Sequence, residues 1–347
     1  MDRPPIGQHL GPYELTRRLG EGGVATVYQA THRVLGSTHA VKLLHVPAPS
    51  ARRRLMLEGR IQASVRHPHI VPVTDTVEWN GLPGLVLEFV DGPHLGELLA
   101  AGPLSLAQLD DLATGLFAGV GAVHAAGFVH RDLKPANVLI QAVRDGGRDR
   151  IVPRLADFGL ARAIARTEPG DTHHGVALGT PAYMAPEQVL DARDADQRAD
   201  LWSLGCMLYE LATGRAPFRG ASAFDTMSAV RHVRPTHPRD LRPELPERMV
   251  DAILGCLVKD RKRRVETVDQ LTAVWTGAQV LGKAMAKAEA DPWAQADLAE
   301  VARKGRASQR KQRRRDRSGR SGGHLDALVS DGTRKRPTHL HALIKAA

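Results

Sequence analysis

The chain has 347 residues, of which 42% are apolar and 25% charged, and its formal net charge is +10. This length suits a two-lobed enzyme with an appendage, and the apolar share suffices for a buried core. Its two cysteines stand inside apolar runs and do not indicate a disulfide framework, and no run of 18 apolar residues predicts a membrane span. Because the N-terminus also lacks the apolar region of a secretion signal, we expect a cytoplasmic protein.

The first third of the chain predicts one antiparallel sheet with a single helix. Short β-rich runs broken by glycine turns follow one another from Tyr13 to Val90. Between the third and the fourth run, residues 52–65 carry apolar side chains at helical spacing and end before a His-Pro pair, where a helix should stop. The predicted strands are 13–20, 24–31, 38–46, 70–77 and 84–90.

After Gly92, helical patterns replace the short β-rich runs. Residues 105–108 have the form of a capping box, and leucine and valine then recur every three or four residues, which predicts a long buried helix. Further helices are expected at roughly 198–213, 223–232 and 246–258. The segment 141–154 contains Asp-Gly-Gly, a hairpin turn signal, and reads as a surface elaboration.

The positive charge is confined to the C-terminal end. Residues 277–347 hold 16 Lys and Arg against 7 Asp and Glu, whereas residues 1–276 hold 32 against 31. From Arg303 to Gly323 the sequence is basic with almost no apolar residues, a composition typical of disordered segments. We therefore place a domain boundary near 276 and expect a basic, disordered tail at 277–347.

Two features of the predicted sheet point to phosphate chemistry. Glycines at 20, 22 and 23 allow a tight hairpin whose backbone amides can approach phosphate oxygens, although such a turn alone is more often structural. The third strand carries Lys42 among small apolar residues, and a point charge there suits phosphate groups. Glu58 on the predicted helix is the natural ionic partner of this lysine.

The segment 129–140, VHRDLKPANVLI, is the most specific motif. Asp132, Lys134 and Asn137 supply an acceptor, a cation and a metal ligand within six positions. Phosphoryl transfer has a loose, anionic transition state, so it requires a positioned nucleophile and neutralised charge. Asp157, in a DFG tripeptide 25 residues after Asp132, adds a carboxylate of the kind that magnesium prefers.

Together these motifs resemble the protein kinase signature over residues 13 to about 276, in the form found in bacterial, eukaryote-like (Hanks-type) serine/threonine kinases. The resemblance implies an α+β, two-lobed protein-kinase fold over 11–276, with an N-lobe at 11–91 and a mainly helical C-lobe at 92–276. It implies ATP and Mg²⁺ as cofactors, with Mn²⁺ able to replace Mg²⁺. Protein Ser/Thr hydroxyls, including the chain's own, are the implied acceptors, in bacterial signal transduction.

The resemblance also implies roles for individual residues. Asp132 acts as the catalytic base or orients the hydroxyl, and Lys134 supports the transferring phosphate. Lys42, held by Glu58, contacts the α- and β-phosphates. Thr180, in the sequence GTPAYMAPE, contacts both the aspartate and the lysine of the 129–140 motif. This threonine and Lys134 favour serine/threonine over tyrosine specificity.

Asn137 and Asp157 are the implied magnesium ligands. Leu87 is the implied gatekeeper, followed by the connector at 88–90. The implied nucleotide-binding residues are Leu19, Gly20, Glu21, Gly22, Gly23, Val27, Ala40, Lys42, Leu87, Glu88, Val90 and Leu139. Outside the nucleotide site, Asp200 is implied to tie down the 129–140 motif and Arg264 to pair with Glu187.

Three positions depart from the family pattern. Ala25 stands where the third glycine of the turn is usual, and Gln62 stands where a hydrophobic residue usually packs against the DFG phenylalanine. Gly59 should weaken the predicted helix by about 0.5–1 kcal/mol relative to alanine. The last two leave open where this helix rests, so a substrate or partner could be required to set it.

Two rival functions were weighed. A pseudokinase scaffold usually lacks one of the signature lysine and aspartates, all of which are present. A nucleic-acid binder would use the tail, but the catalytic set makes such binding an addition to an enzyme. Two adjacent histidines, His173 and His174, cannot both face one ion from a regular element, so structural zinc is not expected.

The tail is predicted to dock on a polyanion, either nucleic acid, an anionic membrane surface or an acidic protein, with a solvated tail as the alternative. It lacks the interleaved aromatic residues that stack on single strands. If the partner is duplex DNA, log affinity should fall with log salt at a slope of roughly −0.9 per neutralised phosphate. A chain ending near Ala278 should lose this binding, and equal binding by both chains would contradict the prediction.

Overall fold

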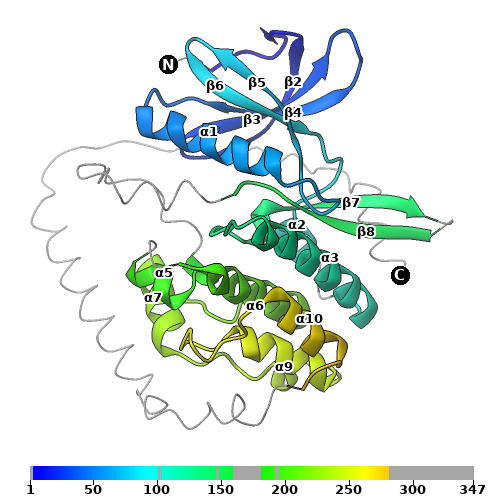
Figure 1. The fold of residues 1–347 in the computed structure, drawn as a ribbon, viewed down its shortest axis with the longest axis vertical. Helices are drawn as coiled ribbons and strands as arrows, with labels where there is room; N and C mark the ends of the chain where they lie inside the picture. The colour runs from blue at the N-terminus through cyan, green and yellow to red at the C-terminus, as the bar shows by residue number, and fades with distance from the viewer. Residues whose placement is uncertain are drawn as a thin grey trace, which may run out of the picture.

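The computed structural model describes residues 3–100, 102, 104–145, 148–158, 181–191 and 195–280. These residues form two lobes (Figure 1). The N-terminal lobe is a twisted sheet with one helix, and the C-terminal lobe is a stack of helices, with a two-stranded hairpin between them. Within the described residues, no helix is long and apolar enough to cross a membrane.

All neighbouring strands of the N-terminal sheet are antiparallel, as the short β-rich runs between glycine turns predicted. The strand order is β1-β2-β3-β4-β6-β5. The fourth predicted strand begins later than expected, because Ile70 and Val71 instead contact Leu155 of the other lobe through a parallel bridge and a hydrogen bond. The strands are β1 (His9–Leu10), β2 (Tyr13–Glu21), β3 (Ala25–His32), β4 (Thr38–Leu44), β5 (Val73–Trp79) and β6 (Leu82–Glu88).

The two faces of this sheet carry different cores. The outer face holds Tyr28 and Leu43, packed with other apolar residues of the sheet. The inner face holds Leu44 and Leu85, packed against helix α1 (Pro49–Ser64). Because side chains alternate along a strand, Lys42 lies on the same inner side as Leu44. The sheet therefore directs the predicted phosphate-binding lysine toward the helix and the other lobe.

Gly59 has a packing role that helix propensity does not reveal. A Cβ at this position would lie 2.5 Å from Cδ2 of the buried Leu85 on β6. Alanine here would gain helix propensity but would overpack the interface between α1 and the sheet. The glycine therefore lets α1 approach the sheet closely, so the expected helix-weakening effect is only part of its contribution.

The C-terminal lobe is built around two buried helices. The capping box predicted at Ser105 is present, with Ser105 Oγ accepting from Gln108 N and Gln108 Oε1 accepting from Ser105 N. The helices at 198–213 and 223–232 are confirmed within one residue, and that at 246–258 is slightly shorter. The helices are α2 (Leu95–Ala100), α3 (Leu106–Ala125), α5 (Pro186–Leu190), α6 (Gln197–Thr213), α7 (Ala223–His232), α8 (Pro238–Leu241), α9 (Glu247–Cys256) and α10 (Val268–Thr276).

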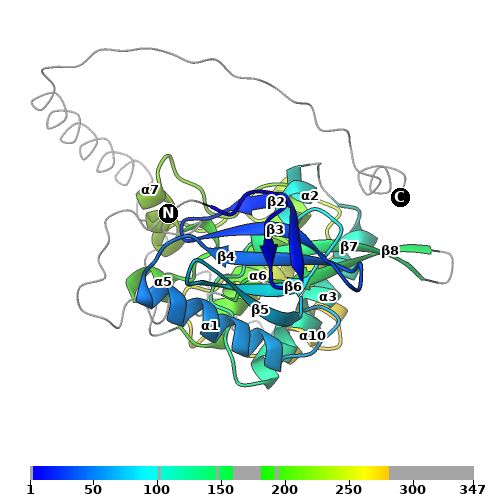
Figure 2. The same cartoon turned by 90° about the horizontal axis from the view of Figure 1, so that it is seen from above.

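A long hairpin of β7 (Val138–Asp145) and β8 (Arg148–Leu155) lies between the lobes, as the turn signal predicted. It extends away from the body of the molecule in both views (Figures 1 and 2). At its base Val138 pairs with Leu155, and Ala156 N donates to Asn137 O at 2.9 Å. The hairpin therefore brings the chain before β7 and the chain after β8 side by side.

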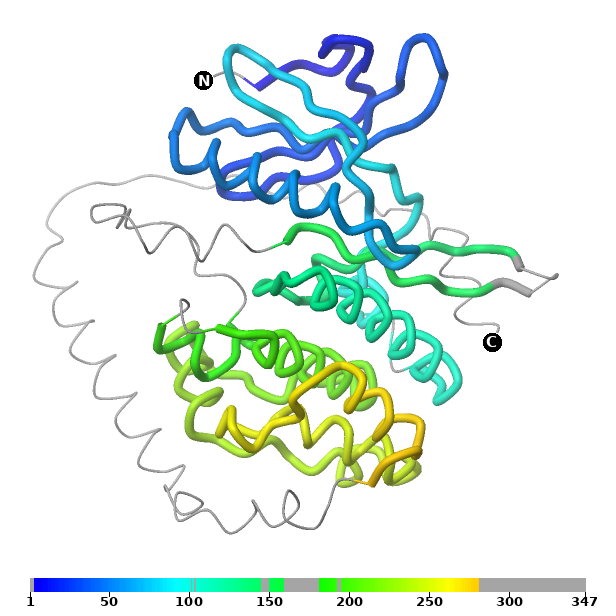
Figure 3. Tube along the Cα trace, viewed as in Figure 1, coloured from blue at the N-terminus to red at the C-terminus, as the bar shows by residue number. Residues whose placement is uncertain are grey.

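One stretch of chain, following β6, connects the sheet to α2 (Figure 3). Gly92 in this connector leaves no room for a side chain, since a Cβ there would lie 1.9 Å from the carbonyl oxygen of Ile140 on β7. That atom belongs to the backbone and cannot move aside easily. The glycine thus fixes how closely the connector approaches the hairpin.

Candidate active site

Lys42 is held between two carboxylates from different segments. Its Nζ donates to Glu58 Oε1 at 2.7 Å and to Asp157 Oδ1 at 2.8 Å. The Glu58 side chain is 7% exposed, whereas that of Asp157 is 43% exposed. The predicted pairing of Lys42 with Glu58 is therefore present, and α1 rests in the position that forms it.

The pKa values of this trio follow from burial and charge. Burial raises the pKa of Glu58 to about 7, against the opposing effect of the Lys42 ammonium. Burial would lower the pKa of Lys42, but the charges of Asp157 and Glu58 together raise it. For Asp157, the raising effect of burial is outweighed by Lys42, so its pKa is lowered. An ionised Asp157 facing partly open space is suited to a cation.

Gln62 has a different role from the hydrophobic residue it replaces. It is 1% exposed, and its Nε2 donates to the carbonyl of Val71 at 2.6 Å. This bond ties α1 to the segment that leads into β5. The polar departure from the family pattern thus anchors the helix instead of loosening it.

The loop at 130–137 brings three of its polar side chains, those of Asp132, Lys134 and Asn137, together. Lys134 Nζ donates to Asp132 Oδ2 at 2.7 Å. Asn137 Nδ2 donates to the carbonyl of Asp132 at 2.9 Å, to its Oδ2 at 3.1 Å and to the carbonyl of Asp157 at 3.4 Å. Asn137 therefore joins this loop to the segment after β8.

Asp200 on α6 holds the backbone of the same loop in place, as predicted. This fully buried carboxylate accepts from His130 N and Arg131 N at 2.8 Å each. The Nε2 of His124 on α3 contacts it at 2.8 Å, a partner that the sequence analysis missed. His130 also stacks on Phe158, with ring centroids 4.8 Å apart, which links the loop to the DFG tripeptide.

Two residues of the site have left-handed backbones. The φ of Arg131 is 67° and that of Asp157 is 56°. Such conformations of residues other than glycine cost on the order of 1–3 kcal/mol each and persist only where the surroundings enforce them. Their place beside Asp132 and next to Phe158 indicates a preorganised site.

The predicted pair of Glu187 and Arg264 is confirmed as a two-pronged ion pair. Arg264 Nη1 and Nη2 donate to Glu187 Oε1 and Oε2 at 2.7 and 3.0 Å. Arg264 is 2% exposed, and its guanidinium lies 5.0 Å from the ring centroid of Trp202. The pair fastens α5 to the core of the larger lobe.

The apolar residues assigned to the adenine pocket gather between the lobes. Leu87 and Val90 belong to one cluster, with Ala40 and Leu139 packed against it, and Ala40 pairs with Leu87 in the sheet. Val27 lies on β3 beside Lys42. These residues therefore come from three strands of the sheet, the connector and β7.

The glycine turn has space around it. A Cβ on Gly20 or Gly23 would meet nothing within 4 Å, and Gly22 N closes the turn by donating to Ala25 O at 2.8 Å. Leu19 is 40% exposed. The side chain of Glu21 forms ion pairs with Arg3 and Arg18. The glycines of this turn have only backbone groups to offer a nucleotide.

Glu88 in the connector is held by a contact that the sequence did not reveal. Arg154 Nη2, on β8, donates to Glu88 Oε2 at 3.0 Å, and Arg154 Nη1 donates to Gln141 Oε1 at 2.7 Å. The hairpin thus contacts the connector at Glu88, one of the residues assigned to nucleotide binding.

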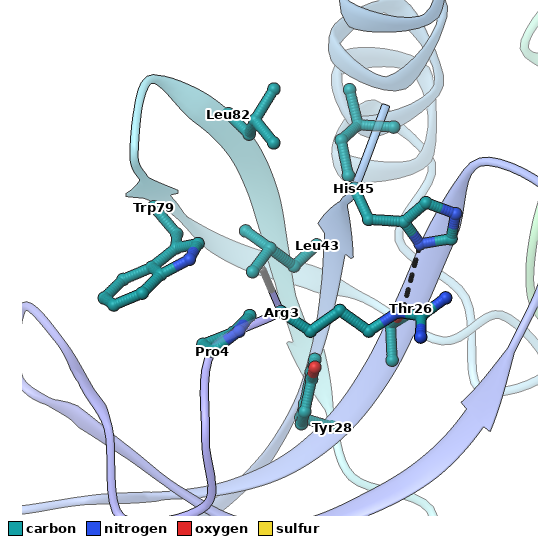
Figure 4. A pocket seen from close by; sticks show the side chains of 9 residues that line it. Arg3, Pro4, Thr26, Tyr28, Leu43, His45, Trp79 and Leu82 are labelled. Carbon is teal, nitrogen blue, oxygen red and sulfur yellow. Dashed lines mark hydrogen bonds between the residues drawn. The ribbon is translucent and has the colours of Figure 1, made fainter. Parts of the chain in front are cut away.

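A narrow depression on the outer face of the sheet lies away from these groups (Figure 4). There His45 Nδ1 lies 3.1 Å from Thr26 Oγ1. Since most of its lining residues, such as Tyr28 and Leu43, occupy the face opposite Lys42, it does not contribute to the site. A second hollow, beside Asp132, is lined by Arg131, Asp132, Leu133, Lys134, Tyr183, Met184, Gln188 and Ser203.

Several predicted positions lie outside the described residues. They include Thr180, the histidine pair at 173–174 and the tail beyond residue 280. Every other predicted site residue lies in one of the two groups described above, around Lys42 and the 130–137 loop or around the connector and the glycine turn.

The sequence matches the protein kinase domain family over residues 13–276. It is 35% identical to the serine/threonine-protein kinase Pkn1 of Myxococcus xanthus, over 76% of this chain and 38% of that protein. It is 38% identical to the DNA damage-responsive serine/threonine-protein kinase RqkA of Deinococcus radiodurans, over 78% of this chain and 40% of that protein. A crystal structure of the Mycobacterium tuberculosis PknI kinase domain, a double mutant, aligns with a TM-score of 0.61 and 25% identity, over 80% of this chain and 99% of that one.

The chain belongs to the protein kinase family, and these relatives are bacterial serine/threonine kinases. The expected two-lobed protein-kinase fold is confirmed. The chain spans about two fifths of the length of the curated relatives it matches.

Proposed function

We propose that the chain transfers the γ-phosphate of ATP to serine and threonine hydroxyls of proteins, including its own. The observation that carries this proposal is the convergence of three distant segments. Asp157 contacts Lys42 at 2.8 Å, while Asn137 reaches both Asp132 and the backbone of Asp157. A cation, an acceptor and metal-ligating oxygens thus meet at one place between the lobes.

In this proposal each polar group has one task. Asp132 accepts the hydrogen bond of the attacking hydroxyl and orients it. Lys134, 2.7 Å from that carboxylate, faces the transferring phosphate and neutralises its growing charge. Lys42, fixed by Glu58, contacts the α- and β-phosphates.

Asn137 and Asp157 fit a magnesium ion. Asp157 offers an ionised, partly exposed carboxylate, and Asn137 uses its Nδ2 within the protein, which leaves its amide oxygen for a metal. The ion would neutralise phosphate charge when ATP is bound. The adenine ring would lie among Val27, Ala40 and the gatekeeper Leu87, with the connector backbone at its edge.

The acceptor residue type can be tested directly. Incubation with labelled ATP, Mg²⁺ and a generic basic protein, followed by phosphoamino-acid analysis, should find label on serine and threonine. Label on tyrosine alone would contradict the specificity. Complete absence of label with intact ATP binding would instead favour the pseudokinase reading.

Phosphorylation between residues 157 and 187 is expected to raise activity. Arg131 Nη2 donates to Ala195 O at 3.2 Å, but its buried Nε has no hydrogen-bond partner among the residues that the structure describes. A phosphate on Thr172, or alternatively Thr167, would supply one, and a charged hydrogen bond contributes about 1.5–3 kcal/mol, or roughly 10- to 100-fold in rate. Mass spectrometry of active protein should locate this phosphate. Full activity in a chain unmodified there would contradict the expectation, as would full activity of the two alanine variants combined.

The tail, the cellular location and the signalling role remain predictions. Docking of residues 277–347 on a polyanion concerns a segment outside the described residues, and its test is the truncation near Ala278 given above. The protein substrate belongs to the same proposal, because the chain covers only part of the length of its relatives.

A further inference from the structure

Gln188 connects α5 to the loop that carries Asp132. It is 8% exposed, and both ends of its side-chain amide are used. Its Nε2 donates to the carbonyl of Arg131 at 3.0 Å, and its Oε1 accepts from Ala185 N at 3.0 Å. The amide therefore joins the start of α5 to a backbone carbonyl that lies 57 residues before Gln188 in sequence.

The carbonyl that Gln188 binds belongs to the peptide unit directly before Asp132. A peptide unit is planar, so the direction of the Arg131 carbonyl also fixes the N–H of Asp132. Arg131 is in the left-handed region, with φ of 67°, where a residue with a side chain does not rest unless it is held. Asp200 Oδ1 holds the N–H of Arg131 at 2.8 Å, and Gln188 holds its carbonyl.

The position of Gln188 is itself fixed. The preceding residue, Glu187, accepts hydrogen bonds from Nη1 and Nη2 of the buried Arg264 at 2.7 and 3.0 Å. Gln188 therefore acts from a rigid point, and it lines the hollow beside Asp132 and Lys134. A donor held in this way can hold the loop in a single conformation.

We propose that Gln188 is a positioning residue for phosphate transfer, which holds the peptide before Asp132 so that the carboxylate meets the substrate hydroxyl. This inference rests on the proposed function. Gln188 does not contact Lys42, Glu58 or the connector, so its effect falls on the rate of transfer and not on ATP binding. Misplacement of a catalytic group by about 1 Å can cost roughly 100-fold in rate.

Two substitutions separate this role from capping of α5. Gln188→Glu keeps an oxygen for Ala185 N but removes the donor to Arg131, and Gln188→Met removes both contacts at similar volume. Both should lower kcat for phosphorylation of a generic basic protein by about 10- to 100-fold, with KM for ATP changed less than about twofold. Gln197→Met is the matched control, since Gln197 Nε2 also donates to a backbone carbonyl, that of Glu266 at 3.1 Å, which does not belong to the 130–137 loop. The control should leave kcat unchanged.

Thermal melting of each variant accompanies the kinetics. A wild-type kcat in a folded Gln188→Met or Gln188→Glu protein would overturn the inference while leaving the proposed function intact. A fall in kcat that only mirrors a loss of folded protein, or that appears equally in Gln197→Met, would also overturn it. A folded wild-type protein that transfers no phosphate would overturn the proposed function, and this inference with it.

Discussion

Lys42→Met is expected to lower kcat/KM for phosphate transfer by about 100-fold or more. The substitution removes the ammonium that both Glu58 and Asp157 contact, at 2.7 and 2.8 Å. It leaves Glu58, which is 5% exposed, without its cation, so that this carboxylate should take up a proton. Removing one preorganised charge from a site of this kind costs roughly 100- to 1,000-fold in rate.

Steady-state kinetics with ATP and a generic basic protein measure this effect. The matched control is Lys262→Met, which changes an exposed lysine of the larger lobe and should leave kcat/KM unchanged. Lys42→Arg keeps the charge but not the compact ammonium, so it should recover only part of the activity. Wild-type kcat/KM in Lys42→Met would show that the trio does not bind phosphate in the way proposed.

Arg264→Ala is expected to destabilise the protein by about 3–5 kcal/mol, because it leaves the Glu187 carboxylate without its buried partner. The guanidinium also donates to the carbonyls of Val258 and Arg198 at 2.9 Å each, and these would lose a donor. Urea unfolding followed by circular dichroism would report the loss of free energy of unfolding. The expected loss is a large fraction of the total stability of a typical domain, which is about 5–15 kcal/mol.

Comparison with an exposed pair provides the control. Glu247, whose side chain is 75% exposed, pairs with Arg239 at 2.9 Å, and Glu247→Ala should cost less than about 1 kcal/mol. Glu187→Ala and Arg264→Ala should also combine to less than the sum of their separate effects, since they break the same contact. Equal losses of stability in Arg264→Ala and Glu247→Ala would contradict the claim that the buried pair of Glu187 and Arg264 stabilises the larger lobe.

The parts of the site that could be predicted from sequence are those marked by residue type and short spacing. Asp132, Lys134 and Asn137 stand within six positions, and the loop geometry brings them together as expected. The pairing of Lys42 with Glu58 followed from their places on a strand and the helix after it. In both cases charged or polar side chains at defined positions carry the signal.

Among the contacts that could not be predicted are bonds from a side chain to a backbone carbonyl. Gln188 binds the carbonyl of Arg131 and Gln62 that of Val71. Every residue has a carbonyl, so neither partner is marked by its residue type. Tertiary packing likewise determines the role of Gly59, because its close contact with Leu85 cannot be predicted from helix propensity.

Strand boundaries show the same limit. Ile70 and Val71 have the composition of a strand, and the sequence pattern predicts one strand that runs from them into β5. In the structure they contact Leu155 instead and so connect the two lobes. Local pattern predicted the presence of this strand, whereas its start depended on a partner 85 residues away.

The most direct test of the account compares phosphate transfer by the wild-type protein and Asp132→Asn. Both would be incubated with γ-labelled ATP, Mg²⁺ and a generic basic protein, after circular dichroism has shown that both are folded. The account predicts Mg²⁺-dependent labelling by the wild type and a rate at least about 100-fold lower for Asp132→Asn. Equal labelling by the two proteins, or none by a folded wild type, would contradict it.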